Sequence, residues 1–293
     1  MAGPRRPSGW FGPAAEAQPR TSSAPAAGPP YDRAAGYPAT TAVGPVEAQA
    51  ARTPDAPALV LAGGGRSGDG RWGGGWWGDG RAPMVVGYRE LNARANRLAR
   101  ALAARGARPG TVVGLAPGHP AEVLTALLAV AKSGAAYVPL DPGDPPGHRE
   151  RLLAETAPVC VLGEGVPGAV ALADVDADGL PDTDPPRALT PQHPLCLGYG
   201  PGGRPAPARL SHAEADRRLR ELQSAHPLGP GDRVLQLGLP LWEFLWPLRT
   251  GAAVVLADPR RPGELGALVR ELGVTAVRVT PAVLGGGGRT EFS

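Results

Sequence analysis

Residues 85–140 read VVGYRELNARANRLARALAARGARPGTVVGLAPGHPAEVLTALLAVAKSGAAYVPL and hold two helical patterns that alternate with two strand patterns. The apolar residues of each helical pattern recur every three or four positions and so share one helix face. Gly106 is typical of a helix end. The faces consist of Leu91, Ala95, Leu98 and Leu102 in the first helix and of Leu124, Leu127, Leu128 and Ala131 in the second, at 120–132. Short apolar runs at 111–115 and 135–140 predict buried strands.

The alternation continues to about residue 279. We expect a helix at 148–156, a strand at 158–162 and then a connector rich in Pro and Asp at 163–192. Ser211 and Glu214 have the spacing of a capping box, which predicts a helix start. The pattern predicts an α/β fold with largely parallel sheets flanked by helices. Further strands are predicted at 195–199, 233–237, 252–257 and 275–279, and further helices at 241–249 and 262–272.

Ligands of parallel sheets bind at the carboxyl ends of the strands. The turn at 199–207, which we expect to join a strand to a helix, is therefore the best candidate site on position alone.

Glycine and proline are unevenly distributed along the 293 residues. Many of the 43 glycines and 36 prolines lie in two stretches. Residues 1–44 have no apolar period, and we expect a disordered arm. Residues 63–83 carry glycine runs with Trp72, Trp76 and Trp77. We interpret this second stretch as a mobile insertion between two strands; an aromatic binding loop is the alternative.

Several classes of function are excluded by composition and spacing. A net charge of +3 is too even for a dedicated nucleic-acid binder, and no apolar run reaches the roughly 18 residues that span a bilayer. The N-terminus lacks the apolar stretch of a secretory signal, so we expect a cytoplasmic protein. The histidines show no metal-ligand spacing, and the acids at 174–178 do not match a calcium loop. Lys132 is the single lysine, so any chemistry that needs a lysine must use it.

Three segments resemble the adenylation domains of nonribosomal peptide synthetases, in the AMP-binding, acyl-adenylate-forming ligase superfamily. They are VEAQAARTPDAPAL at 46–59, GYRELNARANRLARALAARG at 87–106 and LLAVAKSGAAYVPLDP at 127–142. The resemblance implies a partial adenylation domain over 45–284, about the first half of such a domain, with an unmatched tail at 285–293. A half domain would expose sheet edges, so we expect poor solubility or self-association.

What the resemblance implies is activation of an amino acid with ATP and magnesium, followed by transfer to a carrier-protein thiol. The third core motif of the family, roughly YTSGSTGRPKG, cradles the triphosphate. Here residues 197–207 read LGYGPGGRPAP, which keeps Gly200, Gly203 and Arg204. The hydroxyl positions hold Gly198, Tyr199, Pro201 and Gly202, and the lysine position holds Ala206. We therefore expect no tightly bound cofactor and no catalytic residue.

The fourth core motif of the family, roughly FDxSVWEF, supplies an aspartate for the α-ammonium group of the substrate. Residues 237–244 read LGLPLWEF, with Gly238 in the aspartate position. The resemblance implies that Leu239 and Trp242 line the amino-acid pocket. The alternative, which we favour, is that this cluster is helix core, because a buried ammonium without an anion is costly.

Three hypotheses follow. The chain is a truncated and degenerate adenylation domain that is inactive alone, or one half of a split enzyme. The third hypothesis is a non-catalytic interaction domain for a synthetase module or carrier protein. None of the three involves nucleic acid or a membrane.

Overall fold

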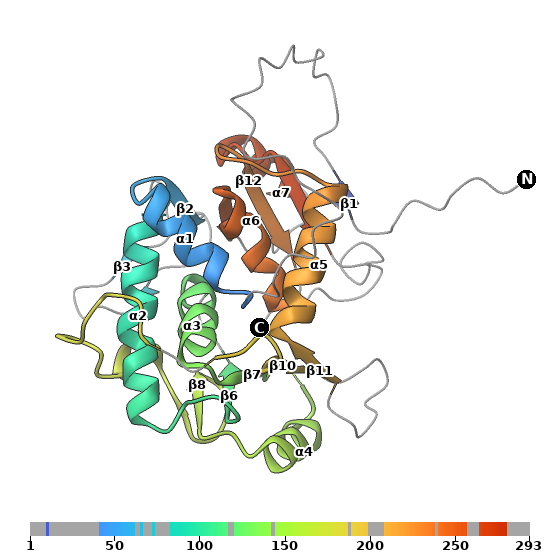
Figure 1. The fold of residues 1–293 in the computed structure, drawn as a ribbon. Helices are drawn as coiled ribbons and strands as arrows, with labels where there is room; N and C mark the ends of the chain where they lie inside the picture. The colour runs from blue at the N-terminus through green and yellow to red at the C-terminus, as the bar shows by residue number, and fades with distance from the viewer. Residues whose placement is uncertain are drawn as a thin grey trace, which may run out of the picture.

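The computed structural model describes residues 10–11, 41–61, 65–66, 72–73, 83–116, 120–141, 144–186, 189–198, 208–237, 240–256 and 264–279. Within these ranges the chain forms two six-stranded sheets with helices between them and on their outer faces (Figure 1). The predicted α/β class is confirmed.

The first sheet has the order β1-β14-β12-β13-β2-β5. Its four central strands are parallel, and the edge strands β1 and β5 run antiparallel to their neighbours. The strands are β1 (Trp10–Phe11), β2 (Pro57–Leu61), β5 (Met84–Gly87), β12 (Arg233–Leu237), β13 (Ala253–Leu256) and β14 (Ala276–Val279).

The second sheet has the order β11-β10-β7-β6-β8-β9 and is parallel except for the pair β10–β11. Its strands are β6 (Val112–Ala116), β7 (Ala136–Pro139), β8 (Cys160–Gly163), β9 (Ala169–Val170), β10 (Pro194–Gly198) and β11 (Ala208–Ser211). A separate antiparallel pair, β3 (Gly65–Arg66) with β4 (Trp72–Gly73), lies within the Gly/Trp-rich stretch; the rest of 63–82 is outside the described residues.

The largest apolar core lies between the sheets and draws on five helices: α1 (Gly44–Arg52), α2 (Tyr88–Ala104), α3 (Pro120–Ser133), α5 (His212–Ala225) and α6 (Leu245–Thr250). The outer face of the first sheet packs against α7 (Glu264–Glu271), and that of the second against α4 (Pro146–Thr156). Both faces of the parallel strands are therefore buried, which explains their continuous apolar sequences. No described helix has the length and apolarity needed to cross a membrane.

The helix signals of the sequence are largely confirmed. The face of α2 buries Leu91, Ala95, Leu98 and Leu102, and Gly106 ends that region with a φ of +94°. Ser211 caps α5, since its Oγ accepts from the Glu214 amide at 3.1 Å.

Two predictions about local structure were wrong. The helix expected at 241–249 is divided into the 3-10 turn η2 (Leu241–Phe244) and α6. Pro247 has no amide to bond the Glu243 carbonyl, so one continuous α-helix cannot form there. The Gly-rich turn does not lead directly into a helix. It joins β10 to the unpredicted strand β11, with Gly198 opposite Ala208 in the antiparallel register.

A short 3-10 turn, η1 (Leu172–Asp174), lies in the connector that follows β9. The end of this connector is hydrogen-bonded to α2. Asn96 Nδ2 donates to the Asp182 carbonyl at 2.6 Å, and Arg100 Nη1 donates to the Thr183 carbonyl, also at 2.6 Å. These bonds explain how a segment without regular structure keeps a fixed path against the helix.

Candidate functional site

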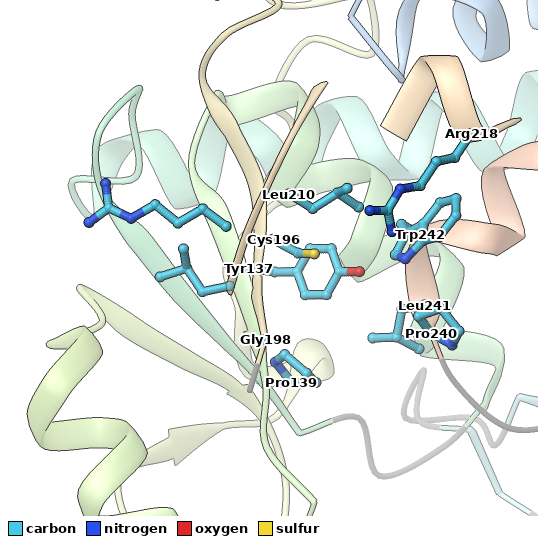
Figure 2. A pocket seen from close by; sticks show the side chains of 11 residues that line it. Tyr137, Pro139, Cys196, Gly198, Leu210, Arg218, Pro240, Leu241 and Trp242 are labelled. Atoms are coloured by element: carbon cyan, nitrogen blue, oxygen red, sulfur yellow. The ribbon is translucent and has the colours of Figure 1, made fainter. Parts of the chain in front are cut away.

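A cavity of about 250 Å³ lies where β7, β10 and β11 of the second sheet face η2 (Figure 2). Pro139 and Gly198, the last residues of β7 and β10, both line it. The cavity is therefore at the carboxyl ends of parallel strands, the edge at which such sheets bind ligands. The complete described lining is Tyr137, Pro139, Cys196, Leu197, Gly198, Arg209, Leu210, Arg218, Pro240, Leu241 and Trp242.

One wall of the cavity is the aromatic side chain of Trp242 on η2. Trp242 is 8 % exposed and belongs to the main apolar core together with Phe244 and Trp246. It therefore packs into the core and also lines the cavity, so the two roles do not exclude each other. Burial of large aromatic side chains on both sides of η2 fixes this short turn, because each contributes about 1.5–3 kcal/mol of transfer free energy.

The floor of the cavity carries Tyr137 of β7 and Cys196 of β10. These residues are opposite each other in the parallel register, and their side chains lie close together in the cavity (Figure 2). Burial raises the pKa of the Tyr137 hydroxyl well above its ordinary value. Burial also raises the pKa of the Cys196 thiol. Both groups are therefore neutral at physiological pH, and the thiol has none of the thiolate character of a nucleophile.

The rim of the cavity carries the guanidinium group of Arg218 on α5. It lies over the Trp242 ring, 6.0 Å from the ring centroid (Figure 2). Its Nε donates to Glu214 Oε1 at 2.8 Å. The hydrogen bonds of Arg217 and Arg218 lower the pKa of Glu214 to about 2, so this carboxylate stays ionised and holds Arg218 in place.

A buried ion pair beside the cavity fixes η2 to the first sheet. Glu243 follows Trp242 in η2, and its Oε2 accepts from Arg278 Nε of β14 at 2.7 Å. The Glu243 side chain is 9 % exposed. Its charge is thus engaged by Arg278, and Glu243 is not among the residues that line the cavity.

The single lysine of the chain lies away from this cavity, in the interior between α1 and α3. Its side chain is 0 % exposed, and Lys132 Nζ donates to Glu47 Oε1 at 2.6 Å and to Asp184 Oδ1 at 2.8 Å. Asn92 and Asn96 donate to the same Asp184 oxygen, each at 3.0 Å. Two of the three N–H donors of the ammonium group are thus used in structural contacts.

The structure brings two of the sequence-derived site residues together, because Gly198 and Trp242 line one cavity. The other phosphate-loop positions, Tyr199, Gly200, Pro201, Gly202, Gly203, Arg204 and Ala206, lie outside the described residues, as do the pocket positions Gly238 and Leu239. What the structure does fix is the base of the loop, where β10 and β11 pair. Within the described ranges, no cluster of three or more His, Cys, Asp or Glu side chains could hold a metal ion.

The lining residues that sequence reasoning missed include Tyr137, Cys196 and Arg218. Tyr137 and Cys196 are polar positions in otherwise apolar strand runs, which is a weak signal. Arg218 follows Glu214 by four residues, and this spacing indicated only an ion pair on a helix face. Their meeting depends on the register of β7 against β10 and on the packing of α5.

Comparison with known proteins agrees with this architecture. The profile of a family described as AMP-binding enzyme matches residues 46–285. Phosphinothricin tripeptide synthetase PhsB of Streptomyces viridochromogenes is 36% identical over 263 residues, which cover 82% of this chain and 20% of that protein. Enterobactin synthase component F of Escherichia coli (strain K12) is 30% identical over 266 residues, covering 84% of this chain and 19% of that protein.

The chain also matches solved structures of nonribosomal peptide synthetases. The chain is similar to the crystal structure of the nonribosomal peptide synthetase FmoA3 in its α-methyl-L-serine-AMP bound form, with a TM-score of 0.66 and 27% identity. That match covers 81% of this chain and 26% of the other. The chain therefore spans only about a fifth to a quarter of the length of these three relatives, by the shares of 20%, 19% and 26%.

Proposed function

Because the chain belongs to the AMP-binding enzyme family, in its nonribosomal peptide synthetase branch, we propose that it is an adenylation-type domain that retains a substrate cavity but lacks ATP-dependent ligase activity on its own. One observation carries the proposal. The loop positions that hold the triphosphate in this family contain no lysine, serine or threonine here, and the single lysine of the chain is buried against Glu47 and Asp184.

The expected loss of affinity is large. A charge-assisted hydrogen bond to a phosphate contributes about 1.5–3 kcal/mol, and a neutral one about 0.5–1.5 kcal/mol. Losing one lysine and even two hydroxyl groups therefore weakens triphosphate binding by about 2.5–6 kcal/mol, which is on the order of 100-fold or more. Pro201 and Pro207 also remove two backbone amide donors from the loop.

The residues present do not fit ATP with magnesium. At the base of the loop, Gly198 contributes no side-chain oxygen, and the space around its Cα is open. None of the described residues that line the cavity is a carboxylate that could hold the metal. We therefore derive no adenylation step through this site.

Nucleotide titration tests the proposal directly. A fluorescent ATP analogue with magnesium is titrated into the chain and into a variant with the motif restored by Gly198→Thr, Tyr199→Ser, Pro201→Ser, Gly202→Thr, Ala206→Lys and Pro207→Gly. We expect no saturation of the native chain at micromolar nucleotide and a gain of about 100-fold in the variant. The control is Arg209→Lys, which adds a lysine at an exposed position of β11 and leaves the loop unchanged.

Two results would contradict the proposal. One is micromolar binding of ATP, or amino-acid-dependent pyrophosphate exchange, by the native chain. The other is a restored loop that binds no better than the Arg209→Lys control.

A second candidate function is that of an interaction domain for a synthetase module or a carrier protein, acting in the cytoplasm. The sheet edge beside β14 favours it, because the two-residue edge strand β1 pairs with only Val277 and Arg278 of the four residues of β14. A carrier-protein or synthetase segment in extended form can pair with such an edge. We expect the chain to form a complex with a purified carrier protein or synthetase module in light scattering; elution of all components as separate species would contradict this function.

A further inference from the structure

The cavity beside η2 has one charged side chain directed at it, and that side chain is cationic. Arg218 lies over the Trp242 ring at its rim (Figure 2). Arg209 also borders the cavity, but successive side chains of a strand point to opposite faces. Leu210 points into the cavity in Figure 2, so the side chain of its neighbour Arg209 points away from it.

The donor capacity of Arg218 is only partly used. Its Nε is bonded to Glu214 Oε1 at 2.8 Å, whereas its two terminal Nη groups make no hydrogen bond to any residue in the described part of the chain. A guanidinium group presents five N–H donors in a planar fork that matches a carboxylate. The terminal donors are therefore available to an anion in the cavity.

The carboxylates nearest to the cavity are already engaged. Glu214 accepts from Arg217 Nε at 2.9 Å and from Arg217 Nη2 at 2.8 Å as well as from Arg218, so both of its oxygens are engaged. Glu243 is held by Arg278 at 2.7 Å. A ligand ammonium group entering the cavity would thus meet Arg218 as a like charge, with no described lining carboxylate to balance it.

The rest of the lining is apolar or neutral and partly aromatic. Trp242 and Leu241 form one side, and the neutral pair of Tyr137 and Cys196 lies at the floor. A volume of about 250 Å³ accommodates one phenyl-sized body with a short acyl chain. Apolar walls with one placed polar group are the usual construction of a small-molecule site.

We propose that this cavity selects an aromatic monocarboxylic acid without an α-ammonium group and that Arg218 is the residue that determines this specificity. The inference rests on the proposed function, in which the cavity receives a carboxylic-acid substrate. The aromatic ring packs against Trp242 and Leu241, and the carboxylate accepts from the terminal donors of Arg218.

Three ligands that differ by one group each test the proposal with the full chain in the absence of nucleotide. They are 3-phenylpropionate, L-phenylalanine, which adds the α-ammonium group, and 2-phenylethylamine, which has the ammonium group alone. By calorimetric titration we expect 3-phenylpropionate to bind at least about tenfold more tightly than L-phenylalanine and 2-phenylethylamine to show no saturation.

The matched variants are Arg218→Gln and Arg217→Gln. Both residues bind Glu214, but only Arg218 lies over Trp242. We expect Arg218→Gln to weaken 3-phenylpropionate binding about tenfold or more and Arg217→Gln to leave it unchanged. Circular dichroism checks that both variants remain folded.

Three outcomes would overturn the proposal: L-phenylalanine binding as tightly as 3-phenylpropionate, equal effects of the two arginine variants, or no binding of any of the three ligands. The nucleotide titration of the restored loop is independent of these ligands. Failure of the proposal about the cavity ligand can therefore be distinguished from failure of the proposal that the phosphate loop does not bind ATP.

Discussion

Lys132→Met tests how strongly one buried ammonium group holds the domain together. Lys132 is 0 % exposed and donates to Glu47, whose side chain is 13 % exposed, and to Asp184, whose side chain is 45 % exposed. Methionine keeps most of the aliphatic stem and removes the charge. The substitution therefore isolates the electrostatic contribution from the packing contribution.

The magnitude follows from what each carboxylate can do afterwards. Asp184 is close to half exposed, so water can solvate it, and it keeps its bonds from Asn92 and Asn96. Glu47, whose side chain is only 13 % exposed, loses the hydrogen bond and the charge of the ammonium group. Removing one partner of a buried pair costs about 3–5 kcal/mol, and the exposure of Asp184 places the expected loss near about 3 kcal/mol. A domain of this size then melts about 6–12 °C lower.

Urea denaturation followed by far-UV circular dichroism measures this loss. Lys132→Met/Glu47→Gln removes both the ammonium group and the charge of its Glu47 partner, so we expect it to recover about 1–2 kcal/mol relative to Lys132→Met. Arg89→Met is the control, because the Arg89–Asp55 pair at 3.3 Å is 68 % and 86 % exposed and contributes at most about 0.5 kcal/mol. Equal midpoints for Lys132→Met and the native chain would refute the reasoning, as would a double variant less stable than Lys132→Met.

The same site has a defined pH dependence. Burial opposes ionisation of Asp184, but the hydrogen bond and charge of Lys132, with bonds from Asn92 and Asn96, outweigh it and lower the pKa of the carboxyl. A depressed folded pKa gives stability that is present above the unfolded value of about 3.9 and is lost as the pH falls through the folded value. We expect Lys132→Met to flatten the acid limb of the stability curve below about pH 4; an unchanged acid limb would show that Lys132 does not set this pKa.

Three further changes have effects that the structure defines, each measured as a change in unfolding free energy in urea. Ser211→Ala removes the α5 cap at 3.1 Å and is expected to cost about 1 kcal/mol, whereas Ser211→Asp should restore it. Gly114→Ala, in the middle of β6, would place a Cβ 2.8 Å from Leu140 Cδ1, and we expect a loss of about 1–3 kcal/mol from overpacking. Asp216→Asn weakens a 1 % exposed carboxylate that Arg249 contacts at 2.8 Å, and a loss of about 2–4 kcal/mol is expected.

Periodicity predicted the fold well wherever an element buries one continuous apolar face. The helix face of α2 and the apolar runs of β6 and β7 are examples, because their burial is visible in the order of residue types. Strand β11 was missed: its four residues ARLS alternate between apolar and polar side chains, but the run is short and directly precedes a helix, and its strand structure is seen in its pairing with β10. The division of the expected helix at 241–249 into η2 and α6 could have been predicted, because Pro247 prevents an uninterrupted helix.

The candidate site was only half predictable for a related reason. Gly198 and Trp242 were found because each lies in a motif that can be matched along the sequence. Tyr137 and Cys196 meet only through the register of two parallel strands that are distant in sequence, and Arg218 reaches the cavity only through the packing of α5 against η2. Such contacts are a property of the tertiary structure, and no local spacing encodes them.

The position of the single lysine supports the proposal that the chain lacks ATP-dependent ligase activity. The chain has 30 cationic residues, and every one except Lys132 is an arginine. Lys132 bonds two carboxylates, from α1 and from the connector, and its own side chain is 0 % exposed. A compact ammonium fits there, whereas a planar guanidinium needs more room. Lysine is thus present where packing demands a point charge, and the phosphate-loop position holds Ala206. A loop that relied on charge to hold a triphosphate would have the same need for a cation at that position, and its absence there supports a cavity that binds an acid without activating it.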